Sequence, residues 1–141
     1  VMLRAFMEEF CLAERLEQGV MALEAVPGVD VPFDRGHLRQ VLWNLCRNAL
    51  RYGRRSPGSL MLTMAVTNGR AVLDVQDDGP GISAEHQGKL FEPFFTTAAD
   101  GTGLGLYIAK ELCEANGALL EYHAGGRQPG ACFRITFGEP R

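Results

Sequence analysis

The segment from Gly101 to Lys110 reads GTGLGLYIAK, with glycines at 101, 103 and 105 in front of an apolar run with helical spacing. Glycines at the start of a helix let the backbone approach a phosphate closely, so the segment indicates a phosphate-binding turn. A dinucleotide-binding fingerprint needs a third glycine where Leu106 stands, and a P-loop closes on Lys-Ser or Lys-Thr, where Leu106 and Tyr107 follow Gly105. Neither motif fits, so the rest of the chain has to decide the architecture.

The bulk composition is that of one globular domain. The sequence has 141 residues, of which 46% are hydrophobic and 22% are charged, and its net charge is −3. Without a basic excess or an apolar run near the roughly 20 residues that span a membrane, we expect contact with neither nucleic acid nor membrane. The chain opens on Val1, so we expect it to be part of a longer protein. The scattered cysteines and histidines indicate reduced, mostly buried thiols in a cytosolic protein and no metal cluster: Cys11, Cys46, Cys113 and Cys132, with His37, His86 and His123.

Periodicity and turn signals predict the order of the elements. Helical spacing covers residues 2–18, 36–52, 84–91 and 104–115, with Asp34 placed to cap the second helix. Strand-like text covers 20–26, 29–33, 60–67, 70–77, 118–123 and 131–137, and Asn68-Gly69 is a strong hairpin signal. Mostly local antiparallel pairing, with three helices set between groups of strands, predicts an α+β two-layer sandwich.

The helix HLRQVLWNLCRNALRYG, residues 37–53, carries two stripes. One is apolar and must face the core, and beside it Asn44, Asn48 and Arg51 follow one another at helical spacing. An amide oxygen is a suitable Mg²⁺ ligand, an arginine one turn further on can meet phosphate oxygens, and Tyr52 can lay its ring on a base. A plain solvated polar stripe remains the alternative. The apolar stripe consists of Leu38, Val41, Leu42, Leu45 and Ala49.

The strand AVLDVQDDGPGI, residues 71–82, ends in an acid on its apolar row. Alternation places Asp77 on the same side as Leu73 and Val75, so its carboxylate must find hydrogen-bond donors. A purine amine is such a donor, and Gly79 and Gly81 would let a ligand pass close to the backbone. An ordinary turn explains the glycines equally well, but it does not explain an inward-facing acid.

Together, four stretches in order resemble the nucleotide-binding domain of the GHKL superfamily, and within it the catalytic domain of bacterial sensor histidine kinases. NLCRNALRYG is similar to the N box, DDGPGI to the first glycine box, LFEPFFTT to the F box and GTGLGL to the second glycine box. The resemblance covers residues 20–138. It implies the Bergerat fold, with a mixed, mostly antiparallel sheet covered on one face by about three helices.

The resemblance also implies roles for individual residues. Asn48 matches the Mg²⁺ ligand and Asn44 the other polar contact of the N box, and both are catalytic candidates. Asp77 matches the acid that accepts from the adenine amine of ATP. Phe91, Phe94 and Phe95 would anchor a lid or are simply core aromatics, and Ala98-Ala99 stand where many relatives carry a basic residue. The implied ATP-binding set is Arg51, Tyr52, Asp77, Gly79, Gly81, Ile82, Phe94, Thr97, Gly101, Thr102, Gly103, Leu104, Gly105 and Leu106.

In such kinases the γ-phosphoryl group of ATP moves to a histidine on a separate dimerisation domain. None of the three histidines has the neighbours of such an acceptor, so we expect residues 1–18 to lead in from a missing dimerisation region and 19–141 to form the ATP-binding domain. The sequences of these boxes are similar to those of kinases of nitrogen regulation and type IV pilus regulation. This similarity implies a response regulator that activates sigma-54 transcription, and a cytoplasmic domain of a protein anchored in the bacterial inner membrane.

Two other functions stay open. One is an ATPase of the gyrase, Hsp90 or mismatch-repair kind, but those relatives carry a glutamate where this chain has Asn44. The other is a non-catalytic nucleotide-binding module, against which the intact glycines of both glycine boxes argue.

Overall fold

The computed structural model describes residues 2–26, 29–52, 56–96, 103–124 and 130–138. They form a five-stranded sheet in the order β1-β2-β3-β5-β4. β1 is parallel to β2, and all the other neighbours are antiparallel, so the predicted mixed, mostly antiparallel sheet is confirmed. The elements in chain order are α1 Met2–Ala13, β1 Met21–Ala25, α2 Arg35–Tyr52, β2 Leu60–Thr67, β3 Arg70–Asp77, α3 Ala84–Gln87, α4 Gly105–Ala115, β4 Leu119–Ala124 and β5 Ala131–Thr136.

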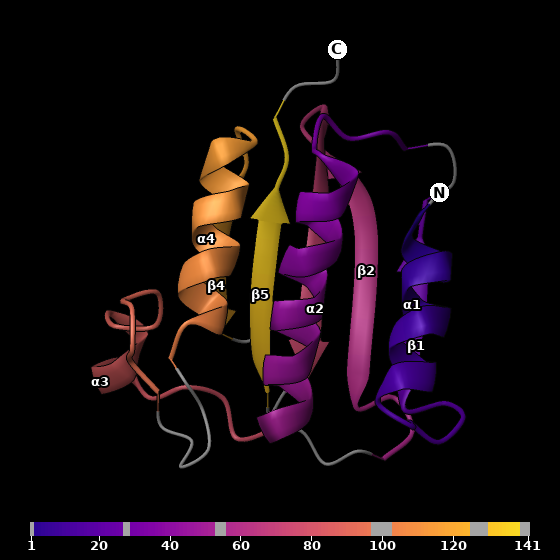
Figure 1. Cartoon of the computed structure of the whole chain (residues 1–141), viewed down its shortest axis with the longest axis horizontal. Coiled ribbons are helices and arrows are strands. Elements are labelled where there is room, and N and C mark those ends of the chain that lie inside the picture. The colour runs from indigo at the N-terminus through magenta and orange to yellow at the C-terminus, as the bar shows by residue number, and fades with distance from the viewer. Residues whose placement is uncertain (1, 27–28, 53–55, 97–102, 125–129, 139–141) are drawn as a thin grey trace.

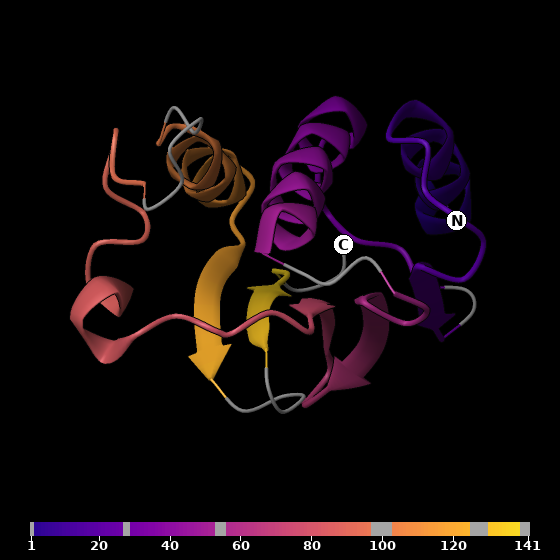
Figure 2. The same ribbon diagram turned by 90° about the horizontal axis from the view of Figure 1, so that it is seen from below.

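The helices and the sheet form two layers. Seen from below, α4, α2 and α1 lie side by side on one face of the sheet, and the short α3 lies beyond the β4 edge (Figure 2). The C-terminal end of α2, the end of β3 and the start of α4 all come to the same end of the molecule (Figure 1). The α+β two-layer fold with three covering helices is therefore as predicted.

The core lies between these layers, and periodicity predicts its members. The apolar stripe of α2 is buried throughout, as are the inward row of β3 and the inward row of β2 as far as Met64, because every second strand residue faces the helices. Leu3, Phe6 and Phe10 of α1 are buried in the same core. The rings of Phe6 and Phe10 meet Trp43 of α2 edge to face, with centroids 6.0 and 5.0 Å apart.

Three predicted elements differ from those observed. The first helix ends at Ala13 rather than at residue 18. There the Leu16 N–H donates to the Cys11 carbonyl oxygen at 3.0 Å, while Arg15 takes a left-handed φ of 54°. This arrangement closes a helix and turns the chain toward β1. Residues 29–33 form no strand: the Phe33 N–H donates within the segment to the Val31 carbonyl oxygen. The helix predicted over 84–91 is only Ala84–Gln87.

The left-handed Arg15 allows a stability prediction. A non-glycine residue in this conformation costs about 1–2 kcal/mol, and glycine avoids most of that cost. We expect Arg15→Gly to raise the free energy of unfolding by about 0.5–1 kcal/mol, offset in part by the greater freedom of glycine in the unfolded chain. Urea denaturation measures the difference. Arg15→Ala keeps the steric cost and should show no such gain, so equal stability of the two variants would contradict the assignment.

The start of α2 is joined to the end of α4. Asp34 caps α2 as predicted, with its Oδ1 accepting from the His37 N–H at 2.9 Å. This hydrogen bond holds the pKa of the Asp34 carboxyl below its usual value, so the cap contributes stability that is lost as the pH falls through the lowered pKa. Asn116 accepts from the Asp34 N–H at 2.9 Å and donates to the Leu112 carbonyl oxygen at 2.8 Å. The two helices are thus joined at the end of α4 opposite the glycine-rich turn that precedes it.

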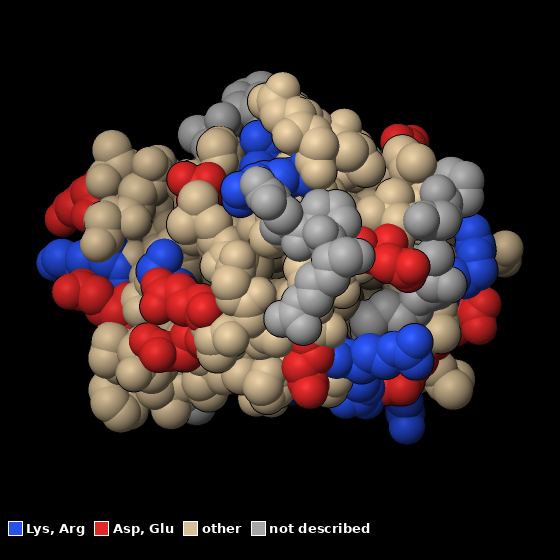
Figure 3. All heavy atoms as spheres, turned by 90° about the horizontal axis from the view of Figure 1, so that it is seen from above, with Lys and Arg blue, Asp and Glu red and all other residues tan. Residues whose placement is uncertain are grey.

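The surface carries charges of both signs. Acidic and basic side chains are interspersed over the face in Figure 3, with no broad area of one sign. All four cysteines are free thiols, and burial raises the pKa of Cys113 and of Cys132 to about 12. Within the described part of the chain, no helix is both long and apolar enough to span a membrane.

Candidate functional site

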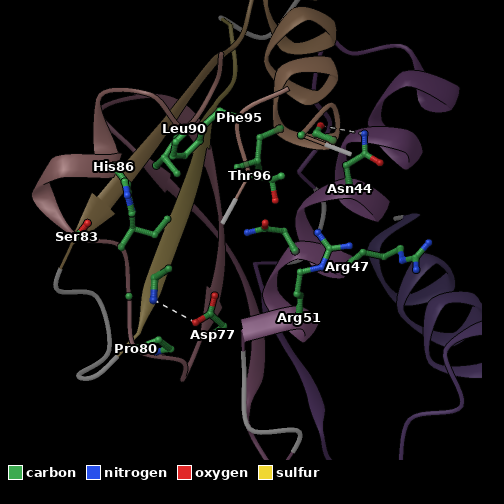
Figure 4. A pocket seen from close by; sticks show the side chains of 17 residues that line it. Asn44, Arg47, Arg51, Asp77, Pro80, Ser83, His86, Leu90, Phe95 and Thr96 are labelled. Carbon is green, nitrogen blue, oxygen red and sulfur yellow. Dashed lines mark hydrogen bonds between the residues drawn. The ribbon is translucent and has the colours of Figure 1, made fainter. Parts of the chain in front are cut away.

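A cavity of about 650 Å³ opens where α2 ends, β3 ends and α4 begins (Figure 4). This volume suits a ligand of nucleotide size. Nine of the predicted site residues line it, although they come from three separate segments of the chain. They are Asn44, Asn48, Arg51, Asp77, Gly81, Ile82, Gly103, Gly105 and Leu106.

The remaining predicted residues lie elsewhere or outside the described residues. Gly79 is buried beneath the wall, and Leu104 is the N-cap residue of α4. The Phe94 side chain is 74% exposed, whereas Phe91 is half-buried against the core and Phe95 lines the cavity. The side chain of Tyr52, residues Thr97, Gly101 and Thr102, and the Ala98-Ala99 pair lie outside the described residues.

Asp77 forms the polar floor of the cavity. Its predicted inward orientation is confirmed, because only 2% of the residue is exposed. Its Oδ1 accepts from the backbone N–H of Gly79 at 2.9 Å and of Ala131 at 3.3 Å. Figure 4 shows the other carboxylate oxygen pointing into the cavity. An acceptor held in this way on an apolar wall can select a ligand edge that donates a hydrogen bond.

The wall near Asp77 is braced from the β4–β5 side of the sheet. The Ile82 N–H donates to the Tyr122 hydroxyl at 3.2 Å, and the Tyr122 ring packs on Phe133 at 5.5 Å between centroids. Gly81 has a φ of 78°, and a Cβ there would lie 3.1 Å from the Gly130 carbonyl oxygen. A side chain at residue 81 would therefore press against the backbone of Gly130, just before β5.

The opposite wall is the polar stripe of α2. Asn44 donates from Nδ2 to the Gly105 carbonyl oxygen at 3.2 Å, so it ties α2 to the first turn of α4. Arg51 lies two turns further along α2 and points toward the cavity (Figure 4). Asn48 lies between them on the same stripe and lines the cavity. The polar stripe therefore lines the cavity.

The start of α4 adds a weakly positive helix end. The N-cap residue Leu104 provides no side-chain cap hydrogen bond, and the first turn carries no acidic residue. Backbone N–H groups in a first helical turn lack helical partners, and the helix dipole favours an anion there. Asn48 and Arg51 of the adjoining α2 also line the cavity, so this part of the site suits an anionic group.

The glycine-rich turn before α4 is held in place at Gly103. The Phe94 N–H donates to the Gly103 carbonyl oxygen at 2.8 Å, and Gly103 takes a φ of 77°. A Cβ at Gly103 would lie 2.5 Å from the Phe94 Cα and 2.7 Å from its carbonyl oxygen. Phe94 itself has a φ of 68°, unusual for a residue with a side chain. Only glycine fits at this crossing of two backbones.

Several lining residues carry no recognisable sequence signal. Ala131 and His86 reach the cavity only through the folded sheet and the loop around α3. Arg47 could have been found, because it lies one turn from both Asn44 and Arg51 on the same helix. The lining residues absent from the predicted set are Arg47, Pro80, Ser83, His86, Leu90, Phe95, Thr96 and Ala131.

The side chains of the cavity suit a cation that is bound partly by a ligand better than a cation bound by protein side chains alone. Among the described residues, no group of three or more His, Cys, Asp or Glu side chains could hold a metal ion. Mg²⁺ commonly takes one or two protein oxygens together with water and phosphate oxygens. The amide oxygen of Asn48, which lines the cavity, can supply such a ligand.

Residues 33–141 match the family model described as histidine kinase-, DNA gyrase B-, and HSP90-like ATPase. The chain belongs to this family. The match covers more than half of the sequence and includes every residue lining the cavity. The superfamily suggested by the four boxes is therefore confirmed, and the cavity lies in a domain of an ATPase family.

Individual relatives are sensor kinases. The chain is 46% identical over 117 residues to the sensor protein kinase PilS of Pseudomonas aeruginosa, covering 80% of this chain and 22% of that protein. It thus spans about a fifth of that relative's length. The nucleotide-free catalytic domain of histidine kinase ThkA has a TM-score of 0.80 and 27% identity, with 99% of this chain and 93% of that one covered. The structure of full-length ShkA in complex with AMPPNP has a TM-score of 0.76 and 28% sequence identity. The match covers 97% of this chain and 30% of that one.

Proposed function

We propose that this chain is the ATP-binding catalytic domain of a sensor histidine kinase. It binds ATP with Mg²⁺ and presents the γ-phosphoryl group to a histidine on a dimerisation domain outside this sequence. Residues 1–18 would lead in from that dimerisation region, with α1 packed on the domain they introduce. The similarity to the catalytic domain of ThkA and to PilS supports this reading.

The observation that carries the proposal is the polarity of the cavity. Asp77 offers a fixed acceptor at one end, where an adenine amine can donate. Asn48, Arg51 and the start of α4 form the other end, where phosphates and their metal would lie. An adenine nucleotide satisfies both ends at once. AMPPNP, bound in the similar ShkA structure, is an adenine nucleotide.

The same cavity favours transfer to another group over hydrolysis. Asp77 is the one carboxylate among the described lining residues, and backbone N–H groups already hold it against the wall. Asn44, where hydrolysing relatives carry a glutamate, donates its amide to Gly105 and has no basic atom to activate water. The domain therefore orients the nucleotide, and the acceptor comes from elsewhere.

The isolated domain is expected to bind ATP but to hydrolyse it far more slowly than about one turnover per second. The reason is that a complete nucleotide site lacks a carboxylate base beside the phosphates. Isothermal titration with ATP and adenosine measures binding, and a phosphate-release assay measures turnover. Rapid turnover by the isolated domain would favour the gyrase-like or Hsp90-like reading, and failure to bind either ligand would rule out both enzymatic readings.

Asn48 is the proposed Mg²⁺ ligand, and the metal would neutralise and align the phosphates. We expect Asn48→Ala to remove most of the Mg²⁺ dependence of ATP binding, whereas the affinity for adenosine should barely change. Titrations of both ligands with and without Mg²⁺ test this. Gln40→Ala, an exposed amide on the same helix outside the cavity, is the control. If adenosine weakens as much as ATP, Asn48 supports the fold rather than the metal.

The further partners follow from the kinase reading. We propose a response regulator as the phosphate acceptor of the whole protein, and an activator of sigma-54 transcription as that regulator, since PilS is among the relatives. The domain would lie in the cytoplasm, in a protein anchored in the bacterial inner membrane. Phosphotransfer from the full-length kinase to candidate regulators tests the pairing.

A further inference from the structure

The cavity has two arginines, and they lie differently. Among the described lining residues, the basic side chains with a permanent charge are Arg47 and Arg51, and both belong to α2. Figure 4 shows the Arg51 side chain directed toward the cavity and the Arg47 side chain extended away from it. Arg47 lies immediately before Asn48 and one turn after Asn44, so rotation about its own side-chain bonds can bring its guanidinium to the phosphate end.

A carboxylate outside the cavity faces Arg47. The Arg47 Nε lies 3.9 Å from Glu14 Oε2, which is too long for a hydrogen bond and leaves a charge attraction. The Arg47 side chain is 59% exposed and that of Glu14 is 21% exposed. Such a partly exposed pair is weak, worth about 1 kcal/mol or less. A bound polyphosphate can therefore compete for the guanidinium.

Glu14 is positioned by α1. Its N–H donates to the Phe10 carbonyl oxygen at 2.9 Å, continuing the helical pattern by one residue. Phe10 packs on Trp43 of α2, so a change in how α1 sits on α2 would move the Glu14 carboxylate relative to Arg47. The pair thus connects the N-terminal helix to the rim of the nucleotide cavity.

We propose that Arg47 is a second phosphate-binding arginine and that Glu14, at the end of α1, holds it outside the cavity until a polyphosphate competes. This inference rests on the proposed function, because it assigns regulation to the same nucleotide site. Arginine binds phosphate through charge-assisted hydrogen bonds, which are stronger than the exposed pair that they replace. The position of α1 then adjusts the affinity for the triphosphate but not for the base.

The chain offers a matched control on the same two helices. Arg39 of α2 pairs with Glu9 of α1, and its Nε lies 2.8 Å from Glu9 Oε1. Neither residue lines the cavity. Glu9→Gln and Arg39→Gln therefore remove an α1–α2 ion pair without touching the nucleotide site.

The test compares Mg²⁺-ATP and adenosine affinities by isothermal titration. We expect Glu14→Gln to tighten ATP binding roughly two- to five-fold, since the restraint on Arg47 is lost. We expect Arg47→Gln to weaken ATP binding about ten-fold, the size of one charge-assisted contact. Adenosine affinity should stay unchanged in both variants. In the Arg47→Gln background, Glu14→Gln should have no further effect, and the Glu9→Gln and Arg39→Gln controls should match the wild type.

Other outcomes would overturn the proposal. Wild-type ATP affinity in Arg47→Gln would show that the guanidinium does not reach the phosphates. Equal behaviour of Glu14→Gln and Glu9→Gln would show that Glu14 does not restrain Arg47. Weakened adenosine binding in Arg47→Gln would indicate a change in the fold of the cavity. A wild-type domain that binds neither ligand would instead overturn the proposed function itself.

Discussion

Gly103→Ala is expected to weaken ATP binding by at least about 100-fold while leaving most of the domain folded. The backbones of Gly103 and Phe94 cross so closely that a Cβ on Gly103 would overlap the Phe94 Cα and carbonyl group. These are backbone atoms, so no side-chain rotation can relieve the overlap. The left-handed φ of 77° adds about 1–2 kcal/mol for any residue with a Cβ.

The effect should fall on the site because of where this crossing lies. Gly103 and the following first turn of α4 line the part of the cavity where we propose that phosphates bind, and Phe95 and Thr96 line it on the other side of the crossing. Separating the two backbone segments would displace both sides together. Such a displacement would misplace several ligand contacts at once, and a single hydrogen bond to a charged group contributes about 1.5–3 kcal/mol.

Gly69→Ala is the matched control for Gly103→Ala. Gly69, in the β2–β3 turn, also has a φ of 77°, but a Cβ added there would have no atom within 4 Å. The Gly69→Ala variant should lose about 1 kcal/mol of stability, because alanine is strained at this left-handed φ, and it should keep its ATP affinity. Thermal melts and ATP titrations of both variants separate the two effects. If both variants bind ATP equally well, the Phe94–Gly103 crossing does not shape the site.

The parts of the fold that sequence predicts are those governed by local chemistry. The β2–β3 hairpin is as expected from Asn68-Gly69, because both residues accept the left-handed conformation that a two-residue turn requires. The burial of α2 follows from one apolar stripe. The end of α1 does not follow, because Arg15 occupies a left-handed position for which its residue type has no preference.

Sequence reasoning also misread an apolar segment near the N-terminus. Residues 29–33 alternate like a strand, yet they form none. Phe33 instead packs edge to face on Phe137, with ring centroids 5.7 Å apart, so the segment buries apolar surface without joining the sheet. Alternation reports which side chains need burial, and it does not say whether the backbone finds a neighbouring strand.

The candidate site also has residues that local periodicity predicts and contacts that only the folded sheet provides. The inward direction of Asp77 follows from the period of a single strand, and the grouping of Asn44, Asn48 and Arg51 follows from the period of a single helix. The two hydrogen bonds to Asp77 show how far such prediction reaches. One donor is two residues away in the sequence, whereas the other is Ala131, 54 residues away. That second donor arrives with β5, whose place beside β3 depends on the whole sheet.

Asp77→Asn is expected to weaken adenine nucleotide binding by about 2–4 kcal/mol, because a buried acceptor is exchanged for a donor. The substitution should leave the fold intact. The amide oxygen of asparagine can still accept from the Gly79 and Ala131 N–H groups that now meet Oδ1. The NH₂ group then replaces the oxygen that points into the cavity, and it would face the adenine amine donor to donor.

Asp78→Asn is the control for this change, because Asp78 carries the neighbouring carboxylate and does not line the cavity. Its Oδ1 accepts from the Ser59 hydroxyl at 2.6 Å, a bond that an amide oxygen can keep. Titrations with ATP should therefore show a large loss for Asp77→Asn and little change for Asp78→Asn. Equal affinities in all three proteins would mean that Asp77 only supports the turn.

A nucleotide with a different base tests the role of Asp77 more directly in the same variant. Inosine triphosphate carries a carbonyl oxygen where ATP carries the exocyclic amine, so it presents an acceptor to residue 77. The wild-type carboxylate should reject it, because two acceptors would meet in a buried site. The asparagine variant can donate to that oxygen, so we expect its preference to reverse, with inosine triphosphate bound more tightly than ATP. A variant that loses ATP affinity without gaining inosine triphosphate would show that Asp77 shapes the cavity but does not read the base.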